Sequence, residues 1–466
     1  MVCIITCEGK TSSKLLTIGP YVRYAPGKLI TDEVDALRDI YTGHKNFLKA
    51  PLYRELRHQS ANSLTMVNKV EHARRRRIIS QCVSDVSLRL HEPTIMFHIK
   101  KCFDLVTKTD DLVRDDKSQP GWTPARDMAD WFNWLTFDIM GDVIFGVTSD
   151  LLGNSAKRNI PIAIEESNVR ISVLAACPNI RLGGLDRWLF PKAIVARNEF
   201  LKFLRDLVER CQSSSDGSCL RNAVSILKSS ADPVTGARLS DKEVLAESTT
   251  LCIAGADTAS TALAAIFYYL SNSVHAYTRA SQEVRSIFSS ADEIKAGPTL
   301  SKLVYVRACI NEALRMSPPA GGGLMREVQA GGATVGGRYL PEDIEIGISI
   351  YAIHHNPKYY PSPFEYRPER WIESHKHETR QNVDLAYAAF CPFSLGGRSC
   401  VGKGMAMLEL NLAVAYALFT LDFKLADSEN SGLLQGWGIA NEFPTKDHIV
   451  AAKKGPLLSF KKRSLN

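Results

Sequence analysis

The segment FSLGGRSCVGKG, residues 393–404, places one cysteine and one arginine among four glycines. Glycine gives the backbone access to positive φ and lets it approach another body closely, and arginine offers a planar fork of donors that suits a carboxylate. A cysteine held in such a turn is a nucleophile, a metal ligand or a buried apolar side chain. The rest of the chain has to decide among these three roles.

Composition excludes several classes of protein. The chain has 466 residues, of which 45% are hydrophobic and 23% charged, so it is long enough to fold around a full core and has no signature of disorder. The net charge of +7 is spread along the sequence, and its densest run, ARRRR at Ala73–Arg77, is short and lacks aromatic residues. We therefore expect no nucleic-acid partner.

Cysteine usage and hydropathy point to a folded protein in a reducing compartment or at a cytosolic face. The eleven cysteines include no CxxC pair, which argues against a disulfide framework and a zinc site. Residues 1–18 contain only a short apolar run, MVCIITC, well below the ~20 residues that span a bilayer. Two longer apolar stretches, Leu251–Leu270 and Met407–Leu421, contain Asp257 and Glu409 and are predicted to be buried helices.

Periodicity predicts a mainly helical chain. Between about residues 31 and 288, apolar residues recur at three- and four-residue intervals, most clearly over Asp127–Phe145 and Asn198–Arg210. Segments that alternate or are rich in β-branched residues predict strands at Tyr21–Ala25, Ala333–Leu340, Glu345–Ile353 and Gly455–Arg463. The expected fold class is mainly α with a small β region (α+β).

The position of Cys400 favours a metal ligand. A helix is predicted over Met405–Phe419, so the cysteine comes just before a helix N-terminus. Backbone N–H groups and the helix dipole favour an anionic sulfur there, and a thiolate held by such donors suits iron. Cys391 has no flanking glycine and, like most of the other cysteines, is expected to be a buried apolar side chain.

Three charged residues are predicted to form a buried network. Glu312 and Arg315 are three residues apart in ACINEALRMSPP, among apolar neighbours, and Arg370 follows in FEYRPERW. An exposed pair of this kind contributes little, whereas buried charges persist only when they are paired. We predict that Glu312, Arg315 and Arg370 form a network beneath the cysteine loop.

Two other polar motifs each leave two interpretations open. In AGADTAS, residues 254–260, the Thr258 hydroxyl bonds back to the preceding turn, or the helix widens locally and Asp257 and Thr258 handle a proton. In EHARRRRII, His72 and Arg76 share one helix face, which is a solvated basic surface or a clamp for a cofactor with two carboxylates.

These elements occur together and in order, and the sequence resembles the cytochrome P450 family over about residues 19–463. The haem-binding loop of that family matches at Phe393, Gly396, Arg398, Cys400 and Gly402. Its ExxR helix matches at Glu312 and Arg315, its PERF-type segment at Pro368–Trp371 with Trp371 in place of Phe, and its oxygen-activating helix at Ala254–Thr258. Ala259 stands where the family often has a second hydroxyl. GPYVRYAP and FDIMGDVIFG are most similar to filamentous-fungal members.

The resemblance implies a single catalytic domain over residues 19–463, with haem b between the Asp257 helix and the Cys400 loop. Cys400 would be the axial ligand of iron, the loop glycines would let the backbone pass close to the haem face, and His72, Arg76 and Arg398 would bind its propionates. Residues 1–18 would form a short segment without the membrane anchor usual in the family. The chain is therefore expected at the cytosolic face of the endoplasmic reticulum membrane, with membrane association possible, or in the cytoplasm.

The activity implied is monooxygenation of a lipophilic small molecule, by hydroxylation or epoxidation with one oxygen atom of O2, in fungal secondary-metabolite biosynthesis. Electrons would come from NADPH through a cytochrome P450 reductase, with Arg74, Arg75 and Arg77 facing solvent as its docking patch. Two alternatives are a haem-thiolate isomerase or dehydratase that needs no reductase, and a non-catalytic product of a truncated gene. The substrate pocket is expected along residues 48–66, the Asp257 helix, Pro318–Met325 and Leu434–Asn441.

Overall fold

The structure is a computed structural model, and the N-terminal segment 1–18 lies outside the residues that it describes. The described residues are 19–43, 46–55, 60–108, 121–177, 179–180, 184–213, 222–374, 378–426 and 441–464.

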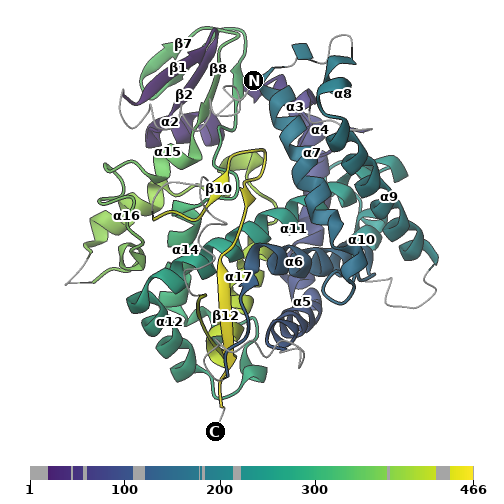
Figure 1. Ribbon diagram of the computed structural model, residues 1–466. Coiled ribbons are helices and arrows are strands. Elements are labelled where there is room, and N and C mark those ends of the chain that lie inside the picture. The colour runs from purple at the N-terminus through teal and green to yellow at the C-terminus, as the bar shows by residue number, and fades with distance from the viewer. Residues whose placement is uncertain are drawn as a thin grey trace.

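Helices make up most of the described chain (Figure 1). The α-helices are α2 (Val34–Arg38), α3 (Leu52–Glu55), α4 (Lys69–Cys82), α5 (Asp85–Val106), α6 (Met128–Phe145), α7 (Asn159–Ala176), α8 (Leu185–Leu189), α9 (Pro191–Ser213), α10 (Ala223–Ser229), α11 (Asp241–Asn272), α12 (Val274–Ile287), α13 (Pro298–Ser301), α14 (Val304–Met316), α15 (Ile350–His354), α16 (Arg380–Ala389) and α17 (Lys403–Thr420). A π-helical turn is η1 (Asp39–Gly43), and 3-10 turns are η2 (Ser155–Lys157), η5 (Ala291–Glu293), η6 (Pro368–Trp371) and η7 (Gly396–Arg398). The helices expected from periodicity correspond to α6, α9 and α17.

The strands form one larger sheet and three smaller ones. They are β1 (Tyr21–Ala25), β2 (Lys28–Thr31), β3 (Phe47–Lys49), β4 (Arg126–Asp127), β5 (Arg326–Val328), β6 (Ala333–Val335), β7 (Arg338–Leu340), β8 (Glu345–Ile348), β9 (Leu421–Leu425), β10 (Thr445–Lys446), β11 (Ala452–Lys453) and β12 (Leu457–Lys462). The five-stranded sheet has the order β1-β2-β8-β5-β3, with β2 and β8 parallel and the other pairs antiparallel. The remaining sheets are β4-β12-β9, β6-β7 and β10-β11. The predicted α+β class is confirmed, and β1, β2, β7 and β8 gather at one corner of the molecule (Figure 1).

Two of the predicted strands are partly wrong. The segment Ala333–Leu340 is not one strand but two, β6 and β7, which pair with each other. The segment Glu345–Ile353 is extended only as far as Ile348, and α15 follows. The side chain of Ser349 accepts a hydrogen bond from the N–H of Ala352 (3.2 Å), so it caps a new helix that alternation alone does not reveal.

Helix α11 crosses the core and carries the Asp257 segment. It begins with a capping box formed by Ser240 and Glu243, and it packs closely on α6, because a Cβ on Gly255 would come within 2.5 Å of Met140 Cε. Among the described helices α11 alone is long and apolar enough to cross a membrane, but most of its apolar stretch is buried inside the protein. The prediction of buried helices over Leu251–Leu270 and most of Met407–Leu421 is therefore confirmed.

Candidate functional site

Cys400 lies in a loop that its own backbone hydrogen bonds fold into a tight turn. The N–H of Cys400 donates to the carbonyl of Phe393 (2.8 Å), and the N–H of Ser399 donates to the carbonyl of Gly396 (3.0 Å). Helix α17 begins at Lys403, three residues after Cys400. Of the eight free cysteines in the described ranges, Cys400 alone is exposed.

The electrostatic surroundings of Cys400 differ from those of Cys391. Protein atoms around Cys400 raise the pKa of its thiol, while the N–H groups of Gly402 and Lys403 and the charges of Arg76 and Lys403 act in the opposite direction. Burial raises the pKa of the Cys391 thiol to about 12. Among the described cysteines, Cys400 alone therefore combines an exposed residue with N–H donors and positive charges that favour a thiolate.

Two glycines that define the loop, Gly396 and Gly402, differ in how much room the chain leaves for a side chain. Gly396 adopts a φ of +69°, and a Cβ at this position would overlap the carbonyl oxygen of Tyr41 in η1. A Cβ on Gly402 would lie 3.9 Å from Cys400 Sγ, an ordinary contact. Gly396 is therefore required by the contact between two parts of the chain, and the close approach of the loop backbone to a haem face stays a prediction.

Basic side chains from distant parts of the chain gather beside the loop. His72 and Arg76 extend from α4, and burial followed by the charges of Arg398, Lys49, Arg76 and Arg326 lowers the pKa of His72 to about 3. Burial and the charge of Arg326 lower the pKa of Arg398 to about 10. Burial and the same two arginines, Arg326 and Arg398, hold the pKa of Lys49 well below its usual value. Mutual repulsion of buried cations indicates a site built for an anion.

Lys49 and Arg326 were not predicted from the sequence, because neither belongs to a recognisable motif. Strand pairing brings them together: β3 and β5 are antiparallel, and Lys49 lies opposite Arg326 in their register. Only a sheet prediction with the correct register could have revealed this pair.

The cluster fits haem through its charge. A group with two carboxylates would relieve the repulsion among these buried cations. A porphyrin with two propionates supplies such carboxylates, and its ring supplies further ligands to an iron that Cys400 would bind.

Two arginines tie the loop to its surroundings. Arg76 donates through Nη1 to the carbonyl of Ser399 (2.5 Å) and through Nη2 to its hydroxyl (3.3 Å). Arg398 donates to the carbonyls of Met66 and Val67, the latter at 2.8 Å. The loop, α4 and the segment before α4 are thus held as one unit.

Glu312, Arg315 and Arg370 lie together in a buried network, with side-chain exposures of 0%, 0% and 2%. Glu312 accepts two hydrogen bonds from Arg315 (3.0 and 2.9 Å) and one from Arg370 Nε (2.8 Å). The backbone N–H of Arg367 (3.1 Å) and the indole N–H of Trp371 (2.9 Å) complete the set. Burial would raise the pKa of Glu312, but the two guanidinium groups outweigh it, so the carboxyl pKa is lowered. Trp371 in place of Phe therefore adds a donor.

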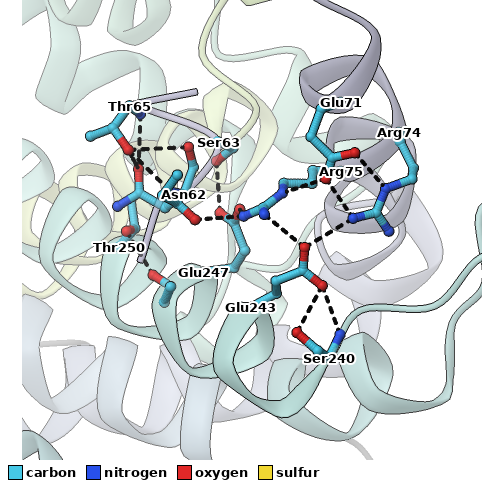
Figure 2. Close-up of polar contacts among 12 residues, drawn as sticks. Asn62, Ser63, Thr65, Glu71, Arg74, Arg75, Ser240, Glu243, Glu247 and Thr250 are labelled. Carbon is cyan, nitrogen blue, oxygen red and sulfur yellow. Dashed lines mark hydrogen bonds and ion pairs between the residues drawn. The ribbon is translucent and has the colours of Figure 1, made fainter. Parts of the chain in front are cut away.

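The predicted solvent-facing patch of Arg74, Arg75 and Arg77 is wrong. Arg75 is buried and bonds to Glu71 (3.0 Å), Glu243 (2.7 Å) and Glu247 (3.3 Å), as Figure 2 shows. Arg74 shares Glu71 and Glu243 with it (2.6 and 3.0 Å).

Arg77 is also paired, with both carboxylate oxygens of Asp232 (2.5 and 2.9 Å). Apart from Glu71 on α4 itself, these carboxylate partners lie on α11 and the segment before it, far from α4 in the sequence. The charges of Arg74, Arg75 and Arg77 are therefore neutralised within the chain and do not form a free cationic surface.

The Arg75 cluster also fixes the segment that precedes α4. Arg75 donates to the carbonyl of Ala61 (2.6 Å), and the hydroxyl of Ser63 donates to Glu247 (2.8 Å), as Figure 2 shows for Ser63. Lys49 Nζ donates to the carbonyl of Leu64. Residues 61–67 are thus held by the Arg75 cluster and Lys49, together with Arg398 of the Cys400 loop.

Asp257 and Thr258 lie on a continuous α-helix, so the expected local widening of α11 is absent from this described helix. The Thr258 hydroxyl donates to the carbonyl of Ala254 (2.6 Å), which is the structural alternative that the sequence left open. Asp257 is paired with Lys453 Nζ (3.5 Å) and accepts a hydrogen bond from Asn168 Nδ2 (3.3 Å). Around them Ala254 is exposed, so the described chain leaves this stretch of an otherwise buried helix uncovered.

Comparisons with known proteins agree with this geometry. The family model for cytochrome P450 matches residues 44–444. The chain is 41% identical to the cytochrome P450 monooxygenase atnE of Emericella nidulans, covering 96% of this chain and 85% of that one. It is 42% identical to the cytochrome P450 monooxygenase poxM of Penicillium oxalicum, covering 95% and 83%.

A solved structure shares the fold. The crystal structure of the cytochrome P450DA heme domain superposes with a TM-score of 0.72 at 18% identity, over 94% of this chain and 88% of that one. Because the identity is low, this likeness concerns the fold alone. The family model and the fungal relatives, by contrast, span nearly the whole sequence that carries the Cys400 loop and its basic cluster. The chain belongs to the cytochrome P450 family, as one of its monooxygenases.

Proposed function

We propose that this chain inserts one oxygen atom of O2 into a lipophilic small molecule, by hydroxylation or epoxidation, in fungal secondary-metabolite biosynthesis. The observation that carries the proposal is Cys400, the one exposed cysteine among the described residues, beside buried basic side chains whose pKa values are lowered by burial and by one another's charge. When bound, haem supplies the iron chemistry that activates O2, and thiolate ligation favours O–O cleavage. The protein supplies binding, orientation and protons.

The roles of the binding residues follow from their positions. Cys400 would ligate iron, with the N–H groups of Gly402 and Lys403 stabilising its negative charge. His72, Arg76, Arg398, Lys49 and Arg326 would hold the two propionates. Phe393 accepts the N–H of Cys400 through its carbonyl and so fixes the turn that aims the sulfur.

Protons would be handled on α11. Thr258 and Asp257 are adjacent on the stretch of α11 that the described chain leaves uncovered at Ala254. The Thr258 hydroxyl donates a hydrogen bond to the Ala254 carbonyl, but its lone pairs can still accept a second hydrogen bond. The bond to Ala254 therefore does not prevent Thr258 from taking part in proton transfer. Asp257 would supply the proton that Thr258 passes on.

The test is a Thr258→Ala variant measured as product formed per NADPH consumed. Proton delivery by Thr258 predicts that the variant still draws electrons but releases hydrogen peroxide in place of oxygenated product. Thr250→Ala is the matched control. Thr250 lies earlier on the same helix, and its hydroxyl makes the same kind of bond, to the carbonyl four residues before it, Ala246 (2.8 Å). An unchanged ratio in Thr258→Ala would remove Thr258 from the mechanism.

The same assay separates the monooxygenase from an isomerase or dehydratase. Electrons are proposed to come from NADPH through a cytochrome P450 reductase, so product should form only with NADPH, the reductase and O2. Turnover without NADPH would support the isomerase. The substrate itself is best sought by comparing metabolites before and after deletion of the gene and then by the shift that each candidate causes in the ferric haem spectrum.

We propose that the protein works at the cytosolic face of the endoplasmic reticulum membrane. Large apolar side chains are exposed on three neighbouring helices, α7, α8 and α9: Ile162 (57%), Trp188 (79%) and Val195 (58%). Such side chains favour contact with a lipid surface. Binding of the purified protein to phospholipid vesicles, weakened by Trp188→Ser, would support this location, and equal binding by both forms would argue against it.

A further inference from the structure

Asp257 is held on both carboxylate oxygens by side chains from two other elements. Lys453 of β11 places its Nζ 3.5 Å from Oδ1, and Asn168 of α7 donates through Nδ2 to Oδ2 at 3.3 Å. The side chains of Lys453 and Asp257 are only 4% and 16% exposed. Three elements that are distant in the sequence, α7, α11 and the β10–β11 hairpin, therefore meet at one carboxylate.

Burial and neighbouring charges act in opposite directions on the pKa values of Lys453 and Asp257. Burial lowers the pKa of Lys453, and the charges of Asp257, Glu165 and Asp130 act against that. Burial raises the pKa of Asp257, and Lys453 followed by Asn168 act against that. Burial likewise raises the pKa of Glu165. The charged groups that act on this site from the neighbouring elements are Glu165 on α7, Asp130 on α6, Lys446 on β10 and Lys454 after β11.

An ion pair is a poor choice if the only need is packing. Replacing a buried pair by apolar side chains of similar volume is often neutral or stabilising, because the desolvation cost of the two charges disappears. Lys453 is nonetheless buried, and its partner is the carboxylate next to Thr258. A role in the chemistry accounts for both facts.

We infer that Lys453 is a positioning residue for proton delivery, which holds the Asp257 carboxylate through Oδ1 and sets the pH at which Asp257 exchanges its proton. Asn168 holds the second oxygen and so fixes the plane of the carboxylate. The inference rests on the proposed function in that it gives Asp257 a proton to deliver. The exchange involves no redox change: Asp257 gains one proton from its surroundings and loses it again toward Thr258.

The sign of the effect follows from electrostatics. An opposite charge a few ångströms away lowers the pKa of a carboxyl by about 1–3 units. Removing the ammonium of Lys453 therefore moves the protonation of Asp257 to higher pH by about that amount. Lys453→Arg keeps the charge and should restore most of the original value.

The first experiment titrates Asp257 without turnover. Infrared difference spectra of the resting ferric enzyme record the carboxyl C=O band as pH changes, and Asp257→Asn identifies the band by its loss. We expect Lys453→Met to shift the titration midpoint upward, Lys453→Arg to bring it back, and Lys454→Met to shift it far less. Lys454 is a matched control because it is the next residue and is exposed, and its charge acts on Glu165 and Asp130, whereas Lys453 acts on Asp257 itself.

The second experiment records product per NADPH against pH. The limb of the profile that Asp257 governs should move upward in Lys453→Met by the same number of pH units as the infrared midpoint. If Lys453→Met does not load haem, Asn168→Leu takes its place and should also raise the midpoint, because it removes a donor to Oδ2.

Three results would overturn the inference. The first is an infrared midpoint that does not move in Lys453→Met or Asn168→Leu, and the second is a midpoint that moves equally in Lys454→Met. The third is an infrared shift with an unchanged coupling profile, which would contradict the role in proton delivery. The infrared midpoint does not depend on monooxygenation, so failure of the proposed function would appear instead as loss of NADPH-dependent product in the wild type.

Discussion

Replacing Trp371 by Phe tests the buried network of Glu312, because it removes one hydrogen-bond donor from that carboxylate. The indole N–H donates to Glu312 Oε2 at 2.9 Å, and the side chain is buried. A hydrogen bond to a charged group contributes about 1.5–3 kcal/mol to stability. Four donors stay in place, from Arg315, Arg370 and the backbone of Arg367, so the carboxylate keeps its charge.

We therefore expect Trp371→Phe to lower the free energy of unfolding by about 1.5–3 kcal/mol beyond the packing loss, and to keep haem bound. Glu312→Ala leaves two guanidinium groups buried without their carboxylate and should lose more, about 3–5 kcal/mol. Urea titrations followed by haem absorbance measure both values.

The packing loss is measured by Trp131→Phe, because Trp131 packs on Trp134 and lies outside the Glu312 network. A double-mutant cycle with Glu312→Gln isolates the bond itself, since the effect of Trp371→Phe should shrink once the acceptor has lost its charge. Equal losses in Trp371→Phe and Trp131→Phe, with no coupling to Glu312, would refute the reasoning.

Two further predictions concern stability. Burial raises the pKa of Glu409 from 4.5 to about 8, so between these pH values the folded chain holds a proton that the unfolded chain has lost, and stability falls as pH rises. Glu409→Gln should remove that part of the slope and stabilise the protein by about 3 kcal/mol at pH 7 and hardly at all near pH 4, as urea titrations at the two pH values would show; parallel pH slopes for both forms would contradict this. Arg75→Gln leaves the fully buried Glu247 without its guanidinium and should lower the free energy of unfolding by about 3–5 kcal/mol. Arg77→Gln, at a half-exposed arginine, is the control. If it lowers the free energy of unfolding as much as Arg75→Gln does, burial of the Arg75 cluster does not account for the loss.

The parts of the site that were predictable depend on spacing within one element. The loop around Cys400 is continuous in sequence, and Glu312 and Arg315 are three residues apart on α14, so their chemistry can be read from local pattern. The buried helix α11 was equally visible, because its apolar residues form one long run. Local pattern also left the correct structural alternative open for Thr258, whose hydroxyl bonds back to Ala254.

The parts that were missed depend on contacts between distant elements. Lys49 and Arg326 meet only through the register of β3 with β5, and Lys453 reaches Asp257 only because the β10–β11 hairpin lies beside α11. The exposure of Arg75 was mispredicted for the same reason. Its carboxylate partners Glu243 and Glu247 are on another helix, and i,i+3 or i,i+4 spacing on α4 reveals only Glu71.

The predicted bounds of a single domain, residues 19–463, stay a prediction. The expected pocket wall at Leu434–Asn441 lies, apart from its last residue, outside the described residues.

The carbon monoxide difference spectrum of the reduced protein tests the central claim most directly, because it reports which atom of the protein ligates haem iron. The account predicts a thiolate-type spectrum for the wild type and for Cys391→Ser, because Cys391 is buried in the protein. Cys400→Ser should bind haem through the basic cluster, at reduced occupancy, and lose the thiolate-type spectrum. A thiolate-type spectrum that persists in Cys400→Ser, or disappears in Cys391→Ser, would contradict the assignment of Cys400 as the ligand.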